Sequence, residues 1–167
     1  TVRRSRPPTA AAELRALGSQ VMPCPTPEEI NIHDSLDERV ALEIFQGKSQ
    51  SEAFALFHEN AMLCAEALVH MGPRARLYYL DAYLQYLASD ASRGNEWAAS
   101  SLPSVAQAVI ESGLASAQTQ EKLLVALERV HSQFASYVPD RMTQRIYHQV
   151  PGEVRRVIAL LRPGVQT

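Results

Sequence analysis

Three capping signals, close together in the first third of the chain, constrain the fold more than any other sequence feature. A serine or threonine is followed three residues later by a glutamate at Thr26–Glu29, Ser35–Glu38 and Ser49–Glu52. In such a capping box the hydroxyl and the glutamate carboxylate each accept a hydrogen bond from a backbone N–H of the first turn. Pro27 also occupies a first helical position, where its missing N–H costs nothing. Each pair therefore predicts the start of a helix.

The rest of the chain repeats this helical pattern and shows almost no strand signals. No alternating run of branched and aromatic residues is bounded by Asn-Gly or Asp-Gly turns. After a turn or two that follows Thr26, glycines, prolines and caps delimit further predicted helices at 36–46, 50–71, 73–89, 100–112, 117–137, 141–149 and 152–161. A shorter helix is predicted at 10–17. The sequence thus predicts an all-α fold, a single irregular orthogonal helical bundle of about eight helices. We expect residues 1–8 to form a flexible tail and residues 9–167 the one domain.

Composition narrows the class of protein. The chain has 167 residues, of which 46% are hydrophobic and 20% charged, which is ordinary for one globular domain. A net charge of −2 gives no sign of the basic surface that nucleic-acid binding requires. No apolar run reaches the roughly 18 residues of a membrane span, so we expect no membrane partner.

Cys24 and Cys64 are expected to be free thiols in a cytoplasmic protein, although a leader before Thr1 remains an open alternative.

A search for catalytic motifs finds none. The chain lacks a nucleophile elbow, a phosphate-binding Walker loop and a dinucleotide-binding glycine motif. The best metal-like spacings are Glu59, Glu66 and His70 on one helix, and Glu128 with His131 on another. A di-iron bundle would need a second Glu-x-x-His, which is missing. We therefore assign no catalytic residue, no metal ligand and no cofactor, and keep a metal-dependent helical-bundle enzyme as an alternative.

The segment "RLYYLDAYLQYL" has the densest aromatic pattern of the chain. At 100° per residue its leucines form one stripe, expected in the core: Leu77, Leu80, Leu84 and Leu87. A second stripe beside it consists of Tyr79, Tyr83 and Tyr86, while Asp81 lies on a narrow polar side. So wide an apolar arc favours a central helix whose tyrosine hydroxyls reach polar partners. The alternative is a partly exposed tyrosine face that binds another protein.

Charged residues provide a second set of candidates. Asp34, Asp37 and Glu38 are either acidic residues favoured by the dipole at a helix N-terminus or a recognition edge for a basic partner. Arg74 and Arg76 begin the tyrosine helix, where a cation is unfavourable. Carboxylates on a neighbouring helix or an anionic partner would have to hold them. The predicted partner-binding residues are therefore Asp34, Asp37, Glu38, Arg74, Arg76, Tyr79, Tyr83 and Tyr86.

The stretch from about His33 to Ser89 resembles a group of uncharacterised small bacterial all-α domains with a "YYLPAYL"-like helix. The matching residues are Tyr78, Tyr79, Leu80, Ala82, Tyr83 and Leu84, and Asp81 stands where that pattern has proline. Such bacterial domains are often immunity proteins that neutralise a toxin, or regulatory partners of other proteins. The resemblance implies a non-catalytic, immunity- or antitoxin-like protein-binding domain with another protein, a toxin or effector, as its partner. A homodimeric adaptor that associates through the tyrosine helix is a further alternative, and the oligomeric state stays open.

Overall fold

The computed structural model describes residues 22–162, and this part of the chain is all-α, as predicted. The predicted tail and the helix predicted at 10–17 lie outside the described residues. The elements are α2 (Pro27–Ile30), α3 (Leu36–Phe45), α4 (Gln50–Glu59), α5 (Ala61–His70), α6 (Pro73–Ala88), the 3-10 helix η1 (Asp90–Ser92), α7 (Glu96–Glu111), α8 (Ala117–Ser132), α9 (Phe134–Tyr137), α10 (Arg141–Ile146) and α11 (Val150–Leu161).

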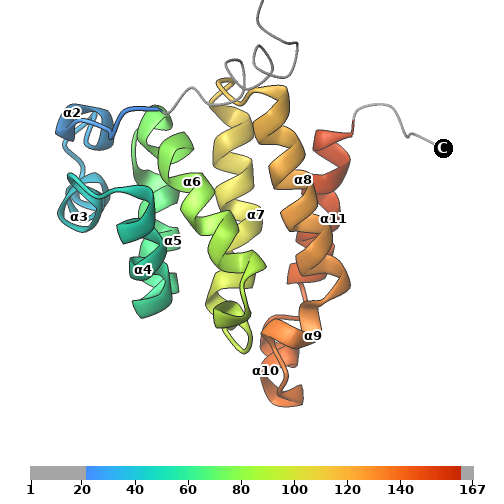
Figure 1. Cartoon of the computed structure of the whole chain (residues 1–167). Coiled ribbons are helices and arrows are strands. Elements are labelled where there is room, and N and C mark those ends of the chain that lie inside the picture. The colour runs from blue at the N-terminus through green and yellow to red at the C-terminus, as the bar shows by residue number, and fades with distance from the viewer. Residues whose placement is uncertain (1–21, 163–167) are drawn as a thin grey trace, which may run out of the picture.

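The longer helices alternate between two layers. In one layer α4 packs against α6 and α6 against α8; in the other α3 packs against α5, α5 against α7 and α7 against α11. Figure 1 shows α6, α7, α8 and α11 side by side, with α2 and α3 at one edge and α10 at the opposite lower end. None of the helices within residues 22–162 is both long and apolar enough to cross a bilayer. The core lies between the layers. Helix α6 contributes more buried residues to it than any other helix of the described part.

The three predicted capping boxes are confirmed. The glutamate carboxylates accept hydrogen bonds from the backbone N–H of Thr26, Ser35 and Ser49 at 3.1, 3.1 and 2.8 Å. The hydroxyls of Ser35 and Ser49 accept in return from the backbone N–H of the glutamates that follow them. Helices α2, α3 and α4 therefore start where the sequence places them.

Two predicted long helices are each divided in the structure. The segment 50–71 breaks at Asn60, whose backbone is extended (φ −151°) and whose side chain accepts from the Leu63 N–H at 3.1 Å to cap α5. The segment 117–137 breaks at Gln133, whose side chain makes no capping hydrogen bond. Asn is a strong N-cap because its side-chain oxygen can accept a helix N–H. Apolar periodicity continues through both breaks and so conceals them.

Helix α7 begins earlier than predicted and so includes a proline. Asn95 caps it by accepting from the Ala98 N–H at 3.1 Å, which places Pro103 in the middle of the helix. The prediction had placed this proline near the helix start, because an interior proline removes a hydrogen bond. Helix α11 also begins two residues before the predicted Gly152, at Val150.

Gly72 holds α2 against the junction between α5 and α6. Its backbone N–H donates to the Ile30 carbonyl oxygen at 3.0 Å, and a Cβ at this position would clash with the backbone carbonyl of Glu29. The sequence identified Gly72 only as a helix stop. The structure shows that the close approach of α2 also requires it.

Candidate functional site

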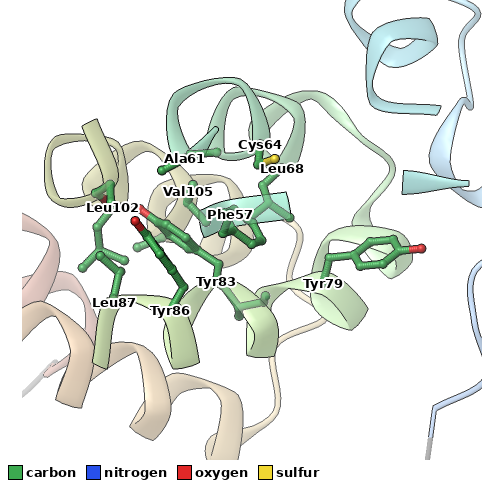
Figure 2. Packing of buried hydrophobic residues seen from close by; sticks show 14 of the residues in the cluster. Phe57, Ala61, Cys64, Leu68, Tyr79, Tyr83, Tyr86, Leu87, Leu102 and Val105 are labelled. Atoms are coloured by element: carbon green, nitrogen blue, oxygen red, sulfur yellow. Dashed lines mark hydrogen bonds between the residues drawn. The ribbon is translucent and has the colours of Figure 1, made fainter. Parts of the chain in front are cut away.

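The three candidate tyrosines lie inside the fold. Tyr79, Tyr83 and Tyr86 have at most 1% of their surface exposed, and their rings point from α6 toward the surrounding helices (Figure 2). Their hydroxyls donate to the backbone carbonyl oxygens of Phe45 at 2.6 Å, Ala98 at 2.5 Å and Ala91 at 3.3 Å, respectively. The chain's own helices therefore cover the tyrosine face, and a partner cannot reach these rings in this structure.

Aromatic neighbours complete the enclosure of these rings. The ring of Phe45 from α3 lies 4.6 Å from that of Tyr79, and Phe57 from α4 lies 5.2 Å from Tyr83, measured between centroids. Such tilted pairs add to the stability that burial provides. Burial also raises the pKa of the Tyr83 hydroxyl well above its usual value. These tyrosines remain neutral hydrogen-bond donors that tie α6 to its neighbours.

The tyrosine stripe is buried more completely than the leucine stripe. Leu80 and Leu87 are at most 2% exposed, but Leu77 and Leu84 are only partly buried at the edge of the core. The prediction that all four leucines form the core therefore holds fully for two of them. Hydrophobicity alone ranks leucine above tyrosine, whereas here the tyrosines can be buried because each hydroxyl finds a carbonyl acceptor.

Arg76 is a buried structural residue. The residue is 9% exposed, and its guanidinium donates to the carbonyl oxygens of Leu68, Val69 and Met71 at 2.7, 2.7 and 2.8 Å, and to that of Ala108 at 3.0 Å. Burial lowers its pKa. A cation is favourable at a helix C-terminus, where unpaired carbonyls carry partial negative charge. Arg76 therefore closes the end of α5, and backbone carbonyls rather than carboxylates or an anionic partner hold it.

Arg74 is held by a carboxylate on a neighbouring helix, which is one of the two predicted possibilities. Its Nη1 lies 2.8 Å from Oε1 of Glu29 on α2, and 61% of its side chain is exposed. A neighbouring carboxylate thus compensates for the unfavourable position at the start of α6. The two arginines were predicted to contact a partner together, but the structure separates their roles.

Glu38 is the buried member of the acidic segment. It is 4% exposed, and its carboxylate accepts from the N–H groups of Ile32, His33 and Ser35 at 3.3, 3.0 and 3.1 Å and from the Ser35 hydroxyl. Nδ1 of His33 lies 3.0 Å from its Oε1. Burial alone would raise the pKa of Glu38, but the hydrogen bonds outweigh it and lower the pKa to about 2. The carboxylate is used in folding the α2–α3 connection.

Asp34 lies at the turn before α3, on the surface. Its φ of +57° is in the left-handed region, which aspartate tolerates better than most residues. Its carboxylate accepts from Arg39 at 2.8 and 2.6 Å and from Asn31 at 3.2 Å. The Arg39 guanidinium and the Asn31 amide hold the pKa of Asp34 at about 2. Asp34 therefore presents a charged but already paired carboxylate.

Asp37 faces outward beside a second helix. Its side chain is 64% exposed, and its Oδ2 lies 3.9 Å from Nδ1 of His70 at the end of α5. Oε1 of Glu66 lies 3.3 Å from the other ring nitrogen of His70. Two carboxylates from α3 and α5 thus flank one imidazole on the surface. This group was not predicted as a unit, because Asp37 and His70 are distant in sequence.

Exposed apolar side chains accompany these carboxylates. Ile32 is 49% exposed, and Leu36, the first residue of α3, is 76% exposed. We call Ile32, Asp34, Leu36, Asp37 and the exposed Glu43 of α3 the acidic edge. An apolar centre with a charged rim is the common anatomy of protein interfaces. Sequence periodicity could have identified Leu36, which lies off the buried stripe of α3.

Charge is unequally divided along the chain. Residues 22–90 contain eleven aspartates and glutamates against four arginines and lysines, a formal net charge of −7. Residues 91–162 contain six acidic and eight basic residues, a formal net charge of +2. The overall charge of −2 conceals this division. Residues 22–90, which include the acidic edge, therefore carry an excess of negative charge, and such an excess attracts basic surfaces.

The residues with metal-like spacing do not come together into one site within residues 22–162. No group of three or more His, Cys, Asp and Glu side chains in this range could hold a metal ion. Glu128 instead forms an ion pair with Arg162 at the end of α11. Glu66 and His70 contact one another and Asp37, as described above.

Comparisons with known proteins add no further assignment: no family model, curated protein or solved structure matches the chain.

Proposed function

We propose that this chain is a non-catalytic protein-binding domain whose acidic edge covers a basic surface of a partner protein. The charge division supports this proposal most directly, because the acidic part of the chain includes the exposed Asp37 and Glu43 on the same helix as the exposed Leu36. Asp37 and Glu43 are exposed, and neither has an ion pair with an arginine or lysine in the described part of the chain. Charge complementarity of this kind speeds association and selects the partner.

The mode of action that we propose is occlusion, as in immunity and antitoxin-like proteins. Occlusion requires a stable surface and no catalytic group. The enclosed tyrosine face and the capped helices would supply the rigid support for that surface. A basic toxin or effector that acts on an anionic substrate would lose access to it once the acidic edge covers its basic surface.

Affinity capture tests the proposal. The chain is immobilised and exposed to an extract of the cells from which the sequence comes, at low salt and at about 0.5 M salt, where exposed charges are largely screened. A variant with Asp37→Lys and Glu43→Lys reverses the acidic edge. Its matched control, Glu59→Lys with Glu121→Lys, makes the same charge change at exposed sites elsewhere.

We expect a protein that the original chain and the control retain at low salt, and that the edge variant releases. Expressed alone, this partner should inhibit growth, and the original chain but not the edge variant should restore growth. Retention that is equal for all three chains, or no specific retention, would contradict the proposal.

A further inference from the structure

Helix α10 is the one helix within residues 22–162 that has no buried residue. It nonetheless carries two large apolar side chains, Met142 and Ile146, which are 72% and 70% exposed. A helix normally forms because it can bury an apolar face. The apolar side chains of α10 are therefore left unpartnered by the rest of the described fold.

Two arginines of the same helix lie beside Met142. Arg141, Arg145 and His148 line an open hollow of about 540 Å³ together with Met142 and Gln144. Neither arginine has a carboxylate within ion-pair distance among residues 22–162. The nearest acid in sequence, Asp140, caps α10 by accepting from the Thr143 N–H at 2.7 Å and the Thr143 hydroxyl at 2.8 Å. The hollow thus combines one exposed apolar side chain, Met142, with two arginines that have no ion pair among residues 22–162.

The acidic edge has the complementary form. Leu36 is 76% exposed, and the side chain of the next residue, Asp37, is 64% exposed. Glu43, two turns along the same helix, is also exposed. One surface therefore carries an exposed leucine beside the acidic Asp37 and Glu43, and the other an exposed methionine beside two arginines. Figure 1 shows α3 at the left edge of the molecule and α10 at its lower end, well apart, so one chain cannot join its own two surfaces.

We propose that the acidic edge of one copy docks on the α10 hollow of a second copy. Leu36 would contact Met142, and Asp37 would face Arg141 and Arg145. The contact joins two different surfaces and is therefore heterologous, so that each added copy leaves one edge and one hollow free. This inference does not depend on the proposed function, although a basic partner would compete for the same edge.

Sedimentation velocity of the purified chain tests the inference. At low salt the weight-average sedimentation coefficient should rise with protein concentration, and at about 0.5 M salt it should return to the value of the monomer. The variant Arg141→Glu with Arg145→Glu should remain monomeric at low salt. Its matched control, Arg155→Glu with Arg156→Glu on exposed sites of α11, should associate as the original chain does.

A mixing experiment identifies the surfaces. The edge variant, Asp37→Lys with Glu43→Lys, should also be monomeric alone, whereas an equimolar mixture with the α10 variant should associate again. The mixture restores complementary charges at each contact. A monomeric original chain at every concentration and low salt would overturn the inference, as would an α10 variant that associates like its control. Because no extract is used, failure here leaves the proposed function to its own test.

Discussion

The tyrosine stripe of α6 and the acidic segment before and within α3 both contain predicted partner-binding residues, but the tyrosines are buried whereas Asp34 and Asp37 are exposed. The three tyrosines are at most 1% exposed, whereas Leu36 in the acidic edge is 76% exposed. Tyrosines are common at interfaces and also in cores, because their hydroxyl needs only one acceptor. In this chain backbone carbonyls supply that acceptor. The comparison shows that the location of the hydrogen-bond partner, rather than residue type, separates core from surface.

The same distinction separates two adjacent acidic residues. Glu38 is buried and accepts hydrogen bonds from the backbone of the α2–α3 connection, whereas Asp37 points outward with 64% of its side chain exposed. Loss of Glu38 should therefore reduce stability, and loss of Asp37 should reduce binding. The predictions below test this division, beginning with the largest effect on stability.

Replacement of Arg76 should have the largest effect of the changes considered. Arg76→Met leaves the carbonyl oxygens at the end of α5 without donors and should lower the free energy of unfolding by about 3 kcal/mol or more. Chemical denaturation measures this change. The matched control is Arg74→Met, which removes an exposed ion pair and should cost less than about 1 kcal/mol. Equal losses in the two variants would contradict the structural role of Arg76.

Removal of the Glu38 charge should have the next largest effect. Glu38→Gln should lower the free energy of unfolding by about 2 kcal/mol at neutral pH, because charge-assisted hydrogen bonds are lost. The pKa of Glu38 falls from 4.5 to about 2 in the folded chain. Its contribution is therefore fully present above pH 4.5 and is lost as the pH falls toward 2.

Denaturation of Glu38→Gln and the original chain at several pH values measures this dependence. The difference in stability between them should shrink between pH 4.5 and 2. Glu43→Gln, at an exposed position of the same helix, should show little difference at any pH. A pH-independent difference for Glu38→Gln would show that its carboxylate is not held as the structure describes.

Removal of one tyrosine hydroxyl should have a smaller effect. Tyr83→Phe keeps the ring in place and leaves the Ala98 carbonyl without its donor, which should cost about 1 kcal/mol. Tyr147→Phe, at a half-buried position, should cost less than about 0.5 kcal/mol. Thermal or chemical denaturation compares the two, and no loss for Tyr83→Phe would indicate that its hydroxyl reaches water.

Local signals predicted the helices well because caps act over a few residues. The pairs Ser35–Glu38 and Ser49–Glu52 act at the positions that the sequence indicates. The break at Asn60 was missed because the apolar period continues across it. The role of Arg76 could not be predicted, since its acceptors include Ala108 on α7, far along the chain. The acidic segment was found by charge, but only the fold separates Glu38 from Asp37.

The central claim is that the tyrosines belong to the core and the acidic edge to the binding surface. Its most direct test is the dissociation constant of the captured partner for two variants. Asp37→Lys with Glu43→Lys should weaken binding by about tenfold or more, which corresponds to about 1.4 kcal/mol, while lowering stability by less than about 1 kcal/mol. Tyr83→Phe should bind as the original chain does, although it is less stable. If Tyr83→Phe weakened binding as much as the edge variant, or if the edge variant bound like the original chain, the assignment of core and surface would be wrong.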